Sequence, residues 1–259
     1  MKISLIVSTF NKPEYLFHCL KSISGLQDLP EEVIVADDGS GKETTLVIEQ
    51  FRAQFPVPLI HVRQEDKGFR LSRSRNNGLL KSEGHYLVFI DDDLILHPKF
   101  IADHRSYAQK GYFYCGTRVR LGPMKTAAIM KNHRSVVSCW EGDIKSRLNT
   151  LRIPFLHKFI TGPDYTHKRL RGCHMAFWKS DLIRINGFDE RYNSYGREDS
   201  DIAMRMMHAG VKRINLKWIA ICYHLYHRIE KSASQNDQLL FEVIRKKTII
   251  AAIGIAQHD

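Results

Sequence analysis

The stretch Tyr86-Leu87-Val88-Phe89-Ile90-Asp91-Asp92-Asp93 decides the fold that we expect, because a continuous apolar run ends abruptly in three acids. Apolar runs of this length are typical of strands that are buried on both faces of a parallel sheet. Two earlier runs have the same form. Residues 3–7 are followed by Ser8-Thr9-Phe10-Asn11, and residues 33–36 by Asp37-Asp38-Gly39-Ser40. The three runs predict parallel strands whose polar ends meet at one edge of a sheet.

Segments with helical spacing separate these strands. Asn11 is predicted to cap, and Pro13 to open, a helix whose apolar residues are Leu16, Leu20 and Ile23. The other predicted elements are helices at 43–55, 71–82 and 179–185, one carrying Ile202, Met206 and Ala209, an amphipathic helix at 235–256, and strands at 59–62, 172–178 and 218–223. This alternation predicts an α/β fold with a doubly wound, mostly parallel sheet flanked by helices.

Positive charge is concentrated between residues 118 and 171. The chain has 259 residues and a formal net charge of +11, of which this segment contributes +9, including Lys168, Arg169 and Arg171. The apolar residues among these cations are Trp140, Phe155, Leu156 and Phe159. Two interpretations have equal weight: a solvated excursion from the sheet, or a surface for anionic lipid headgroups, a phosphorylated acceptor or nucleic acid.

Composition and short motifs exclude several classes of protein. Five cysteines without a C-x-x-C pair fit neither a disulfide framework nor a structural zinc site, and they indicate a reducing compartment. The sequence has no signal-peptide pattern and no apolar run near the roughly 20 residues that span a bilayer. We therefore expect a cytoplasmic protein, free or peripheral on the inner face of the cytoplasmic membrane. The sequence also lacks the glycine-rich dinucleotide and P-loop motifs. The predicted crevice at the strand ends is acidic instead, and it would need a divalent cation to receive a phosphorylated ligand.

Six motifs in order resemble those of inverting family 2 glycosyltransferases with the GT-A fold. They are Val7-Ser8-Thr9-Phe10-Asn11-Lys12, Ala36-Asp37-Asp38-Gly39-Ser40, Arg75-Asn76-Asn77-Gly78, Asp91-Asp92-Asp93, Gly187-Phe188-Asp189-Glu190 and Gly196-Arg197-Glu198-Asp199. With Gly68-Phe69-Arg70-Leu71 and a late histidine, the set is similar to bacterial chondroitin-polymerase modules and the β-1,4-galactosyltransferase group. The resemblance covers nearly the whole chain.

The resemblance implies a single Rossmann-like domain of the nucleotide-diphospho-sugar transferase type. We expect a nucleotide-binding half at 1–117, a basic excursion at 118–171, and an acceptor-binding half with a C-terminal helix at 172–259.

The resemblance also implies a site for Mn²⁺ or Mg²⁺. Asp93 would be the main ligand, Asp92 would contact the ribose or the metal's waters, and Asp91 would support them. The second ligand would be a histidine near the end of the last strand. We prefer His224 and keep His227 as an acceptor or phosphate contact, because residues three apart on a continuous strand face opposite sides.

Among the family's reaction residues, Asp199 would deprotonate the acceptor hydroxyl and Glu198 would hold acceptor hydroxyls. The alternative is that Glu198, Asp199 and Asp201 only satisfy free N–H groups at the start of a helix.

For the donor, the resemblance implies that Asp38 accepts a hydrogen bond from uracil N3–H, with Ser8, Thr9 and Asn11 lining the nucleotide pocket. Arg75 would lie near the phosphates, although a helix-surface arginine is more often a solvated charge. His174 would contact the sugar or the acceptor.

The sequence therefore predicts a metal-dependent inverting glycosyltransferase. It would move a hexose or N-acetylhexosamine from a UDP-sugar to a saccharide or lipid-linked saccharide acceptor in bacterial surface polysaccharide or lipopolysaccharide synthesis. Contact with an anionic membrane surface is expected, and nucleic acid is not. Two alternatives remain. A sugar-nucleotide nucleotidyltransferase would carry a glycine-rich triphosphate loop after its first strand, and a non-enzymatic polyanion-binding module would leave the acidic motifs unexplained.

Overall fold

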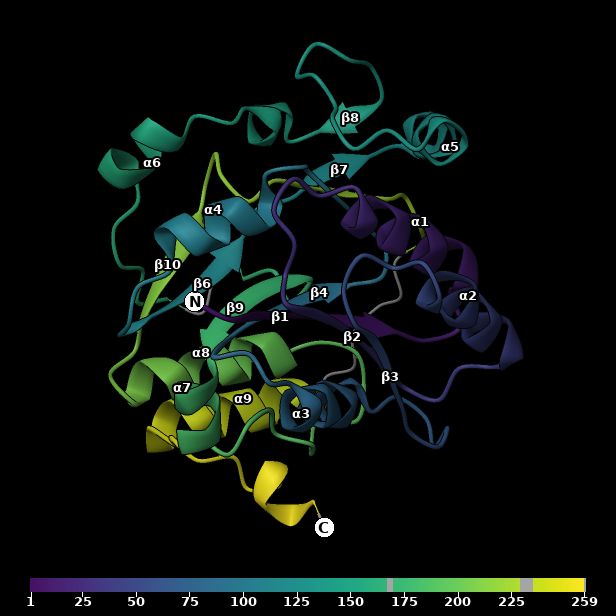
Figure 1. Ribbon diagram of the computed structural model, residues 1–259. Coiled ribbons are helices and arrows are strands. Elements are labelled where there is room, and N and C mark those ends of the chain that lie inside the picture. The colour runs from purple at the N-terminus through teal and green to yellow at the C-terminus, as the bar shows by residue number, and fades with distance from the viewer. Residues whose placement is uncertain (167–169, 229–234, 259) are drawn as a thin grey trace.

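The computed structural model describes residues 1–166, 170–228 and 235–258. A seven-stranded sheet in the order β10-β6-β9-β4-β1-β2-β3 forms its centre (Figure 1). The strands are β1 Ile3–Thr9, β2 Glu32–Asp37, β3 Leu59–Arg63, β4 Tyr86–Asp91, β6 Tyr112–Gly116, β9 His174–Trp178 and β10 Lys212–Leu216. Strand β9 runs antiparallel to its neighbours β4 and β6, and the other pairs are parallel. The predicted α/β architecture with a mostly parallel sheet is confirmed.

Helices cover both faces of this sheet because successive strand side chains point to opposite sides. On one face, alternate residues of β1 such as Leu5 pack with α1 Pro13–Ser24, α2 Lys42–Arg52 and α4 Phe100–Tyr107. On the other face, Ile6 and the next strands pack with the second set of helices. These are α3 Leu71–Lys81, α7 Lys179–Arg184 and α8 Glu198–His208, with α9 Gln235–Lys246 beside α8 in the same layer (Figure 1). The two layers hold the strand ends rigidly, so the loops that follow them keep a fixed geometry.

A second, four-stranded sheet contains two strands of the basic segment together with one earlier and one later strand. Its order is β5-β11-β7-β8, and its strands are β5 Leu94–Leu96, β11 Cys222–His224, β7 Val119–Leu121 and β8 Ile144–Lys145. One face of this sheet packs with α5 Pro123–Asn132 around a small apolar core. The segment also carries the 3₁₀ turn η1 Arg147–Thr150 and α6 Pro154–Ile160. Residues 118–171 therefore include a packed substructure, whereas Lys168 and Arg169 lie outside the described residues.

Three predicted elements need correction. Asn11 does not cap α1: its backbone has φ +50° and its Oδ1 accepts a hydrogen bond from Gly41 N, while Lys12 is the N-cap. The last strand, β11, begins only at Cys222, because Trp218 and Ala220 have positive φ values that break an extended chain. The predicted helix at 235–256 ends at Lys246, and the chain then leaves the helix.

Strand β10 escaped the sequence analysis because only two of its five residues, Lys212 to Leu216, are apolar, and one of the polar residues is a buried arginine. Arg213 is almost fully buried, and its guanidinium pairs with Asp164 at 2.6 Å. A charge that is neutralised by a distant residue cannot be recognised as a strand position from local hydrophobicity.

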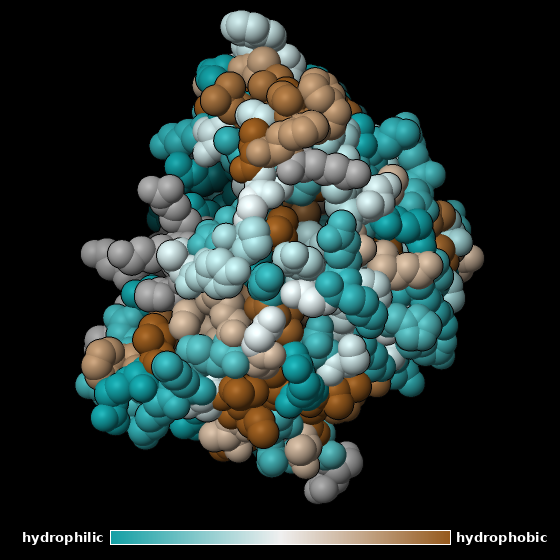
Figure 2. Space-filling model, turned by 90° about the vertical axis from the view of Figure 1, so that its left-hand side faces the viewer, coloured by the Kyte–Doolittle hydropathy of each residue, from teal (hydrophilic) through white to brown (hydrophobic). Residues whose placement is uncertain are grey.

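Exposed apolar side chains gather in two places on the face shown in Figure 2. The upper cluster is where α6 lies, and its residues include Phe155, Phe159 and Ile160. The lower cluster lies over α7 and α9 and includes Ile183 and Phe241. Within the described parts of the chain, the longest helices have 12 residues, and none has the length and hydropathy that crossing a membrane requires.

Candidate active site

The carboxyl ends of β1 and β4 lie side by side and bring polar residues together, as their parallel pairing predicts. Ser8 pairs with Asp91 in the register of the two strands. Beyond the strands, Asp92 N donates to Ser8 O at 3.0 Å, and Thr9 Oγ1 donates to Asp92 Oδ2 at 2.7 Å. The loops after two separate strands thus form one acidic edge.

The last strand brings two histidines to this edge. Antiparallel pairing of β11 with β5 sets His224 opposite Leu94, next to Asp93, and Leu225 N donates to Asp93 O at 2.9 Å. His224 Nε2 lies 3.6 Å from Asp93 Oδ1, and His227 Nε2 lies 3.0 Å from Asp93 Oδ2. The expectation that the two histidines face opposite sides is wrong, because β11 ends at His224 and His227 lies outside the strand.

These three side chains fit a divalent cation. One carboxylate oxygen and two imidazole nitrogens lie within 4.8 Å of one another. Asp93 Oδ1 is buried without a hydrogen-bond partner among the described residues, as a ligand atom directed at an ion would be. Imidazole nitrogen with carboxylate oxygen suits Mn²⁺ better than Mg²⁺, which prefers oxygen ligands.

The charges at this edge are strongly coupled. Burial, and then the charge of Asp93, raises the pKa of Asp92 to about 8. Burial alone would raise the pKa of Asp93 as well, but a hydrogen bond from His227 and the charge of Lys12 hold that pKa below its ordinary value. Burial lowers the pKa of His224 to about 4, which leaves its imidazole neutral and free to bind a metal.

Lys12 is a site residue that the sequence analysis did not assign. Its Nζ lies 3.2 Å from Asp93 Oδ2 and 3.9 Å from Asp92 Oδ1. The signal was its place in the polar loop after the first strand, beside Asn11. Its ammonium offsets part of the acidic charge in the chain without a bound ion.

A pair of carboxylates, Glu198 and Asp199, begins α8 and is linked to the acidic edge through Arg75, which contacts both Asp91 and Glu198. Asp199 Oδ2 accepts a hydrogen bond from Gly172 N at 3.0 Å, and its Oδ1 accepts one from Ser200 N at 2.6 Å. Glu198 Oε2 is buried and has no hydrogen-bond partner among the described residues. Burial, and then the charge of Asp199, raises the pKa of Glu198 to about 7.

The third acid of this helix start has a different role. Asp201 is fully buried and pairs with Arg205 at 2.7 Å, one turn along α8. Arg205 also donates to the carbonyls of Ile185 and Gly187, so the pair anchors α8 to the preceding loop. The capping interpretation therefore does not describe Asp201, whose carboxylate is part of a buried ion pair.

Arg75 connects the acidic strand ends to the carboxylates at the start of α8. Its guanidinium lies 3.1 Å from Asp91 Oδ1 and 3.4 Å from Glu198 Oε1, and Nε donates to Ser8 Oγ at 3.3 Å. The side chain is 1% exposed, which rules out a solvated surface charge. Its neighbour in the motif, Asn76, exchanges hydrogen bonds with the backbone of Phe188, which explains why these motifs occur together.

The loops after β1 and β2 are linked at the nucleotide end of the crevice. Asn11 N donates to Ser40 Oγ, in addition to the bond from Gly41. The Asp38 carboxylate accepts hydrogen bonds from Arg70 N at 2.8 Å and from the Gln64 amide. Asp38 is nearly buried, and burial raises its pKa.

His174 lies inside the core, which contradicts its predicted contact with sugar or acceptor. Its side chain is fully buried, its Nε2 lies 2.8 Å from His104 Nε2, and its ring packs against Phe100. An added Cβ at Gly116 would collide with the His174 ring, so the backbone of β6 also covers it.

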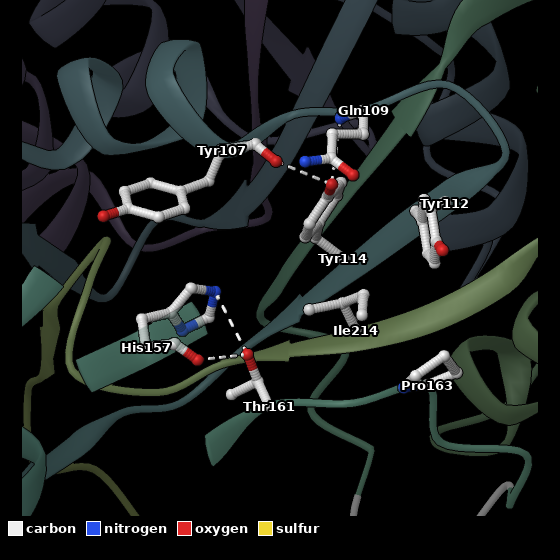
Figure 3. Close-up of a pocket in the computed structure, with 8 residues that line it drawn as sticks. All are labelled: Tyr107, Gln109, Tyr112, Tyr114, His157, Thr161, Pro163 and Ile214. Carbon is white, nitrogen blue, oxygen red and sulfur yellow. Dashed lines mark hydrogen bonds between the residues drawn. The ribbon is translucent and has the colours of Figure 1, made fainter. Parts of the chain in front are cut away.

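A separate pocket of about 340 Å³ lies between β6, β10 and α6, and it contains none of the predicted site residues (Figure 3). Tyr107 and Tyr114 line one side, and His157 and Thr161 of the α6 region line the other. The Tyr114 hydroxyl donates to Tyr107 O, and Thr161 donates to His157 O. The polar groups that face this pocket are largely satisfied within the protein, so it is not the candidate site.

The mostly parallel sheet, with an acidic edge at its strand ends, defines the class of nucleotide-diphospho-sugar transferases with the GT-A fold. The chain belongs to glycosyl transferase family 2, whose family model matches residues 4–175. A second family model, described as the N-terminal domain of galactosyltransferase, matches residues 156–228 and so includes Glu198, Asp199 and His224.

Several curated bacterial proteins are similar to this chain. Hyaluronan synthase of Pasteurella multocida is 26% identical over 237 residues, which are 80% of this chain and 23% of that protein. Chondroitin synthase of Escherichia coli is 25% identical, covering 80% and 32%. Validoxylamine A glucosyltransferase of Streptomyces hygroscopicus is 25% identical, covering 81% and 48%. The chain thus spans between about a quarter and a half of these relatives.

Solved structures share the fold. TarS of Staphylococcus aureus, in a crystal structure with UDP-GlcNAc, has a TM-score of 0.68 and 19% identity, over 99% of this chain and 69% of that one. A mannosyltransferase from Pyrobaculum calidifontis, in complex with GDP-Man and Mn²⁺, has a TM-score of 0.62 and 18% identity, over 96% and 61%. At identities below 20%, these structures show that the fold is shared and nothing more.

Proposed function

We propose that this chain is a metal-dependent inverting glycosyltransferase that transfers a hexose or N-acetylhexosamine from a UDP-sugar to a saccharide acceptor. The observation that carries the proposal is the cluster of Asp93, His224 and His227 at the strand ends, with the carboxylates of Glu198 and Asp199 linked to the same acidic edge through Arg75. A cation site and a separate carboxylate are what a single displacement at an anomeric carbon needs.

In this proposal, Asp93 and the two histidines hold Mn²⁺ or Mg²⁺. When bound, the cation offsets the negative charge that develops on the departing diphosphate. Asp92 and Asp91 carry the remaining acidic charge beside it, and Thr9 keeps Asp92 in place through a 2.7 Å hydrogen bond.

The nucleotide lies across the ends of β1 and β2. Asp38 would accept a hydrogen bond from a uracil N3–H, with Ser8, Thr9 and Asn11 around it. The present hydrogen bonds of Asp38 come from the Arg70 backbone and Gln64, so the segment around Arg70 adjusts when a base arrives. Support for a UDP-sugar comes from the UDP-GlcNAc complex of the structural neighbour TarS.

Asp199 would take the proton of the acceptor hydroxyl as that oxygen bonds to the anomeric carbon and the nucleoside diphosphate leaves. Hydrogen bonds from Gly172 N and Ser200 N fix the orientation of its carboxylate. Glu198 and Arg75 are positioning residues, because the buried pair connects the base to Asp91 on the donor side. Attack from the face opposite the diphosphate inverts the anomeric configuration.

The wider assignment follows the curated relatives. Hyaluronan and chondroitin synthases build polysaccharides, which supports a role in bacterial surface polysaccharide or lipopolysaccharide synthesis on the cytoplasmic side of the membrane. Residues 1–117 would bind the nucleotide, and residues 172–259 the acceptor. Exposed Phe155 and Phe159 beside the basic segment support peripheral contact with an anionic membrane.

Thermal unfolding tests the donor site directly. We expect UDP and Mn²⁺ together to raise the stability by about 2.7 kcal/mol at a hundred times the dissociation constant, and UDP alone to have little effect. The variant Asp93→Ala should lose this stabilisation, whereas the control Asp181→Ala, in α7, should keep it. The absence of any shift with UDP or another nucleoside diphosphate would overturn the proposal.

A further inference from the structure

Beside the candidate metal ligands, the second sheet carries a row of cations. Pairing of β11 with β7 places His224 next to Arg120, and pairing of β7 with β8 places Arg120 next to Lys145. Paired residues point to the same face of a sheet. The opposite face holds Tyr223, Val119, Leu121 and Ile144, which are buried in the small core. The register therefore directs His224, Arg120 and Lys145 outward in one line.

This row lines a hollow of about 400 Å³ that begins at His224 and His227. Arg118 lies two residues before Arg120 and also lines the hollow. Its Nη1 contacts Cys173 Sγ at 3.3 Å, and its Nε is buried without a hydrogen-bond partner among the described residues. Because Cys173 follows Gly172, which binds Asp199, Arg118 lies between the proposed base and the row.

The positive charge in this hollow is only partly offset by the protein. Within the described parts of the chain, the ion pairs within 4.0 Å include none with Arg118, Arg120 or Lys145. Asp143 is the one acid among the lining residues, and its carboxylate accepts a hydrogen bond from Lys125 N in the first turn of α5, so three cations face one carboxylate. Like charges directly opposite in a sheet, such as Arg120 and Lys145, repel each other. An anion between them would relieve that repulsion.

We propose that Arg118, together with Arg120 and Lys145 of this row, forms an acceptor subsite for an acidic group, so that the acceptor is a saccharide bearing phosphate or carboxylate groups. The inference rests on the proposed transferase function and names its acceptor class. Arginine side chains bind both kinds of oxyanion through paired hydrogen bonds. The hollow is lined by the candidate metal ligands His224 and His227 but by neither Asp38 nor Asn11, which belong to the loops after β2 and β1. The subsite is therefore separate from the proposed nucleotide pocket.

Direct binding of labelled oligosaccharides tests this subsite without any transfer step. Three fluorescent hexasaccharides would be compared by anisotropy: a neutral one, one with uronate carboxylates and one with 6-O-phosphates. We expect at least one acidic probe to bind roughly tenfold more tightly than the neutral probe, with the difference falling as salt rises. The double variant Arg120→Gln/Lys145→Gln should abolish the preference for that probe.

A control separates this site from the general attraction of a basic protein for anions. The variant Lys81→Gln/Lys212→Gln loses the same charge from exposed positions at the end of α3 and the start of β10, and it should keep the preference. Equal loss of binding in both double variants would overturn the subsite, as would equal binding of all three probes to the wild type.

The diphosphate of the donor is the other source of an oxyanion at this place. Stabilisation by UDP with Mn²⁺ should be the same in Arg120→Gln/Lys145→Gln as in the wild type. If the double variant loses that stabilisation, the row binds the donor and the acceptor assignment is wrong. If the wild type itself shows no stabilisation by UDP, the proposed function fails, while the oligosaccharide result still reports on the row.

Discussion

His227 Nε2 lies 3.0 Å from Asp93 Oδ2, a contact between the turn after the last strand and the acidic end of β4. The other oxygen of the same carboxylate lies 3.6 Å from His224 Nε2. Two histidines from one short segment therefore share one carboxylate, and both are positioned to share one ion with it.

We expect His224→Ala and His227→Ala each to weaken Mn²⁺ binding by at least tenfold, because each removes a nitrogen ligand from a three-ligand protein site. Calorimetric titration with Mn²⁺ alone measures the effect. His85→Ala is the control, since His85 is exposed before β4 at the other end of the sheet. An unchanged affinity in His227→Ala would show that His227 is not a ligand.

Replacing Lys12 by Gln should increase the affinity for Mn²⁺ by about threefold, because the ammonium 3.2 Å from Asp93 Oδ2 repels the incoming cation. The same titration measures this change, and the increase should shrink at high salt. Weaker Mn²⁺ binding in this variant would mean that Lys12 holds Asp93 in position for the ion.

Asp199→Asn should slow sugar transfer by about 10²- to 10⁴-fold, because an amide cannot accept the acceptor's proton. Stabilisation by UDP with Mn²⁺ should remain, since Asp199 contacts Gly172 and Ser200 and not the cation cluster. Release of UDP from the UDP-sugar that the wild type consumes fastest provides the rate. Asp181→Asn, whose carboxylate pairs with the exposed Arg184 of α7, is the control, and a loss below threefold in Asp199→Asn would exclude the base role.

The stability of the protein should depend on Glu198 between about pH 4.5 and 7. The folded protein raises the pKa of this carboxyl to about 7, above its unfolded value, so the folded state holds the proton more tightly. Stability from this group is complete below the unfolded pKa and is lost as pH rises through the folded pKa. Between pH 5 and 8, wild type should lose on the order of 2 kcal/mol more than Glu198→Gln in urea unfolding. Parallel pH profiles for the two proteins would contradict the shift.

Asp201→Asn should cost about 3–5 kcal/mol of unfolding free energy, because it leaves the buried charge of Arg205 without its partner. The matched control is Asp181→Asn, which breaks a 3.4 Å pair with the exposed Arg184 and should cost less than about 1 kcal/mol. Urea denaturation gives both values. Similar costs for the two variants would mean that the anchoring of α8 does not depend on the buried pair.

The central sheet was predictable because its strands are local patterns. Residues 3–7, 33–36 and 86–90 are apolar runs that end in polar clusters, and each forms a strand with nearly those bounds. Parallel pairing of these strands then places the loops that follow them at one edge of the sheet. Strands β6 and β10 of the same sheet were not predicted. The buried Arg213 of β10 depends on Asp164, which lies far away in the sequence.

The candidate site was predictable in residue type but not in geometry. The resemblance pointed to Asp93, Asp199 and a late histidine, and the structure brings Asp93 together with His224 and His227, while Arg75 links Asp91 to Glu198, the neighbour of Asp199. The segment after β11 is held by a hydrogen bond from Tyr226 N to Thr126 Oγ1, and no local rule indicates that pairing. Burial of His174 likewise depends on its packing against His104 of α4.

Strand β9 lies between β4 and β6 in the sheet although it follows both in the chain. While the ribosome is making the protein, β4 therefore has an unpaired edge until residue 178 has emerged. That edge carries Val88 and Phe89, which are fully buried in the finished fold. Unpaired apolar strand edges promote association between chains. The long basic segment that precedes β9 thus sets the time for which this strand edge stays unpaired during synthesis.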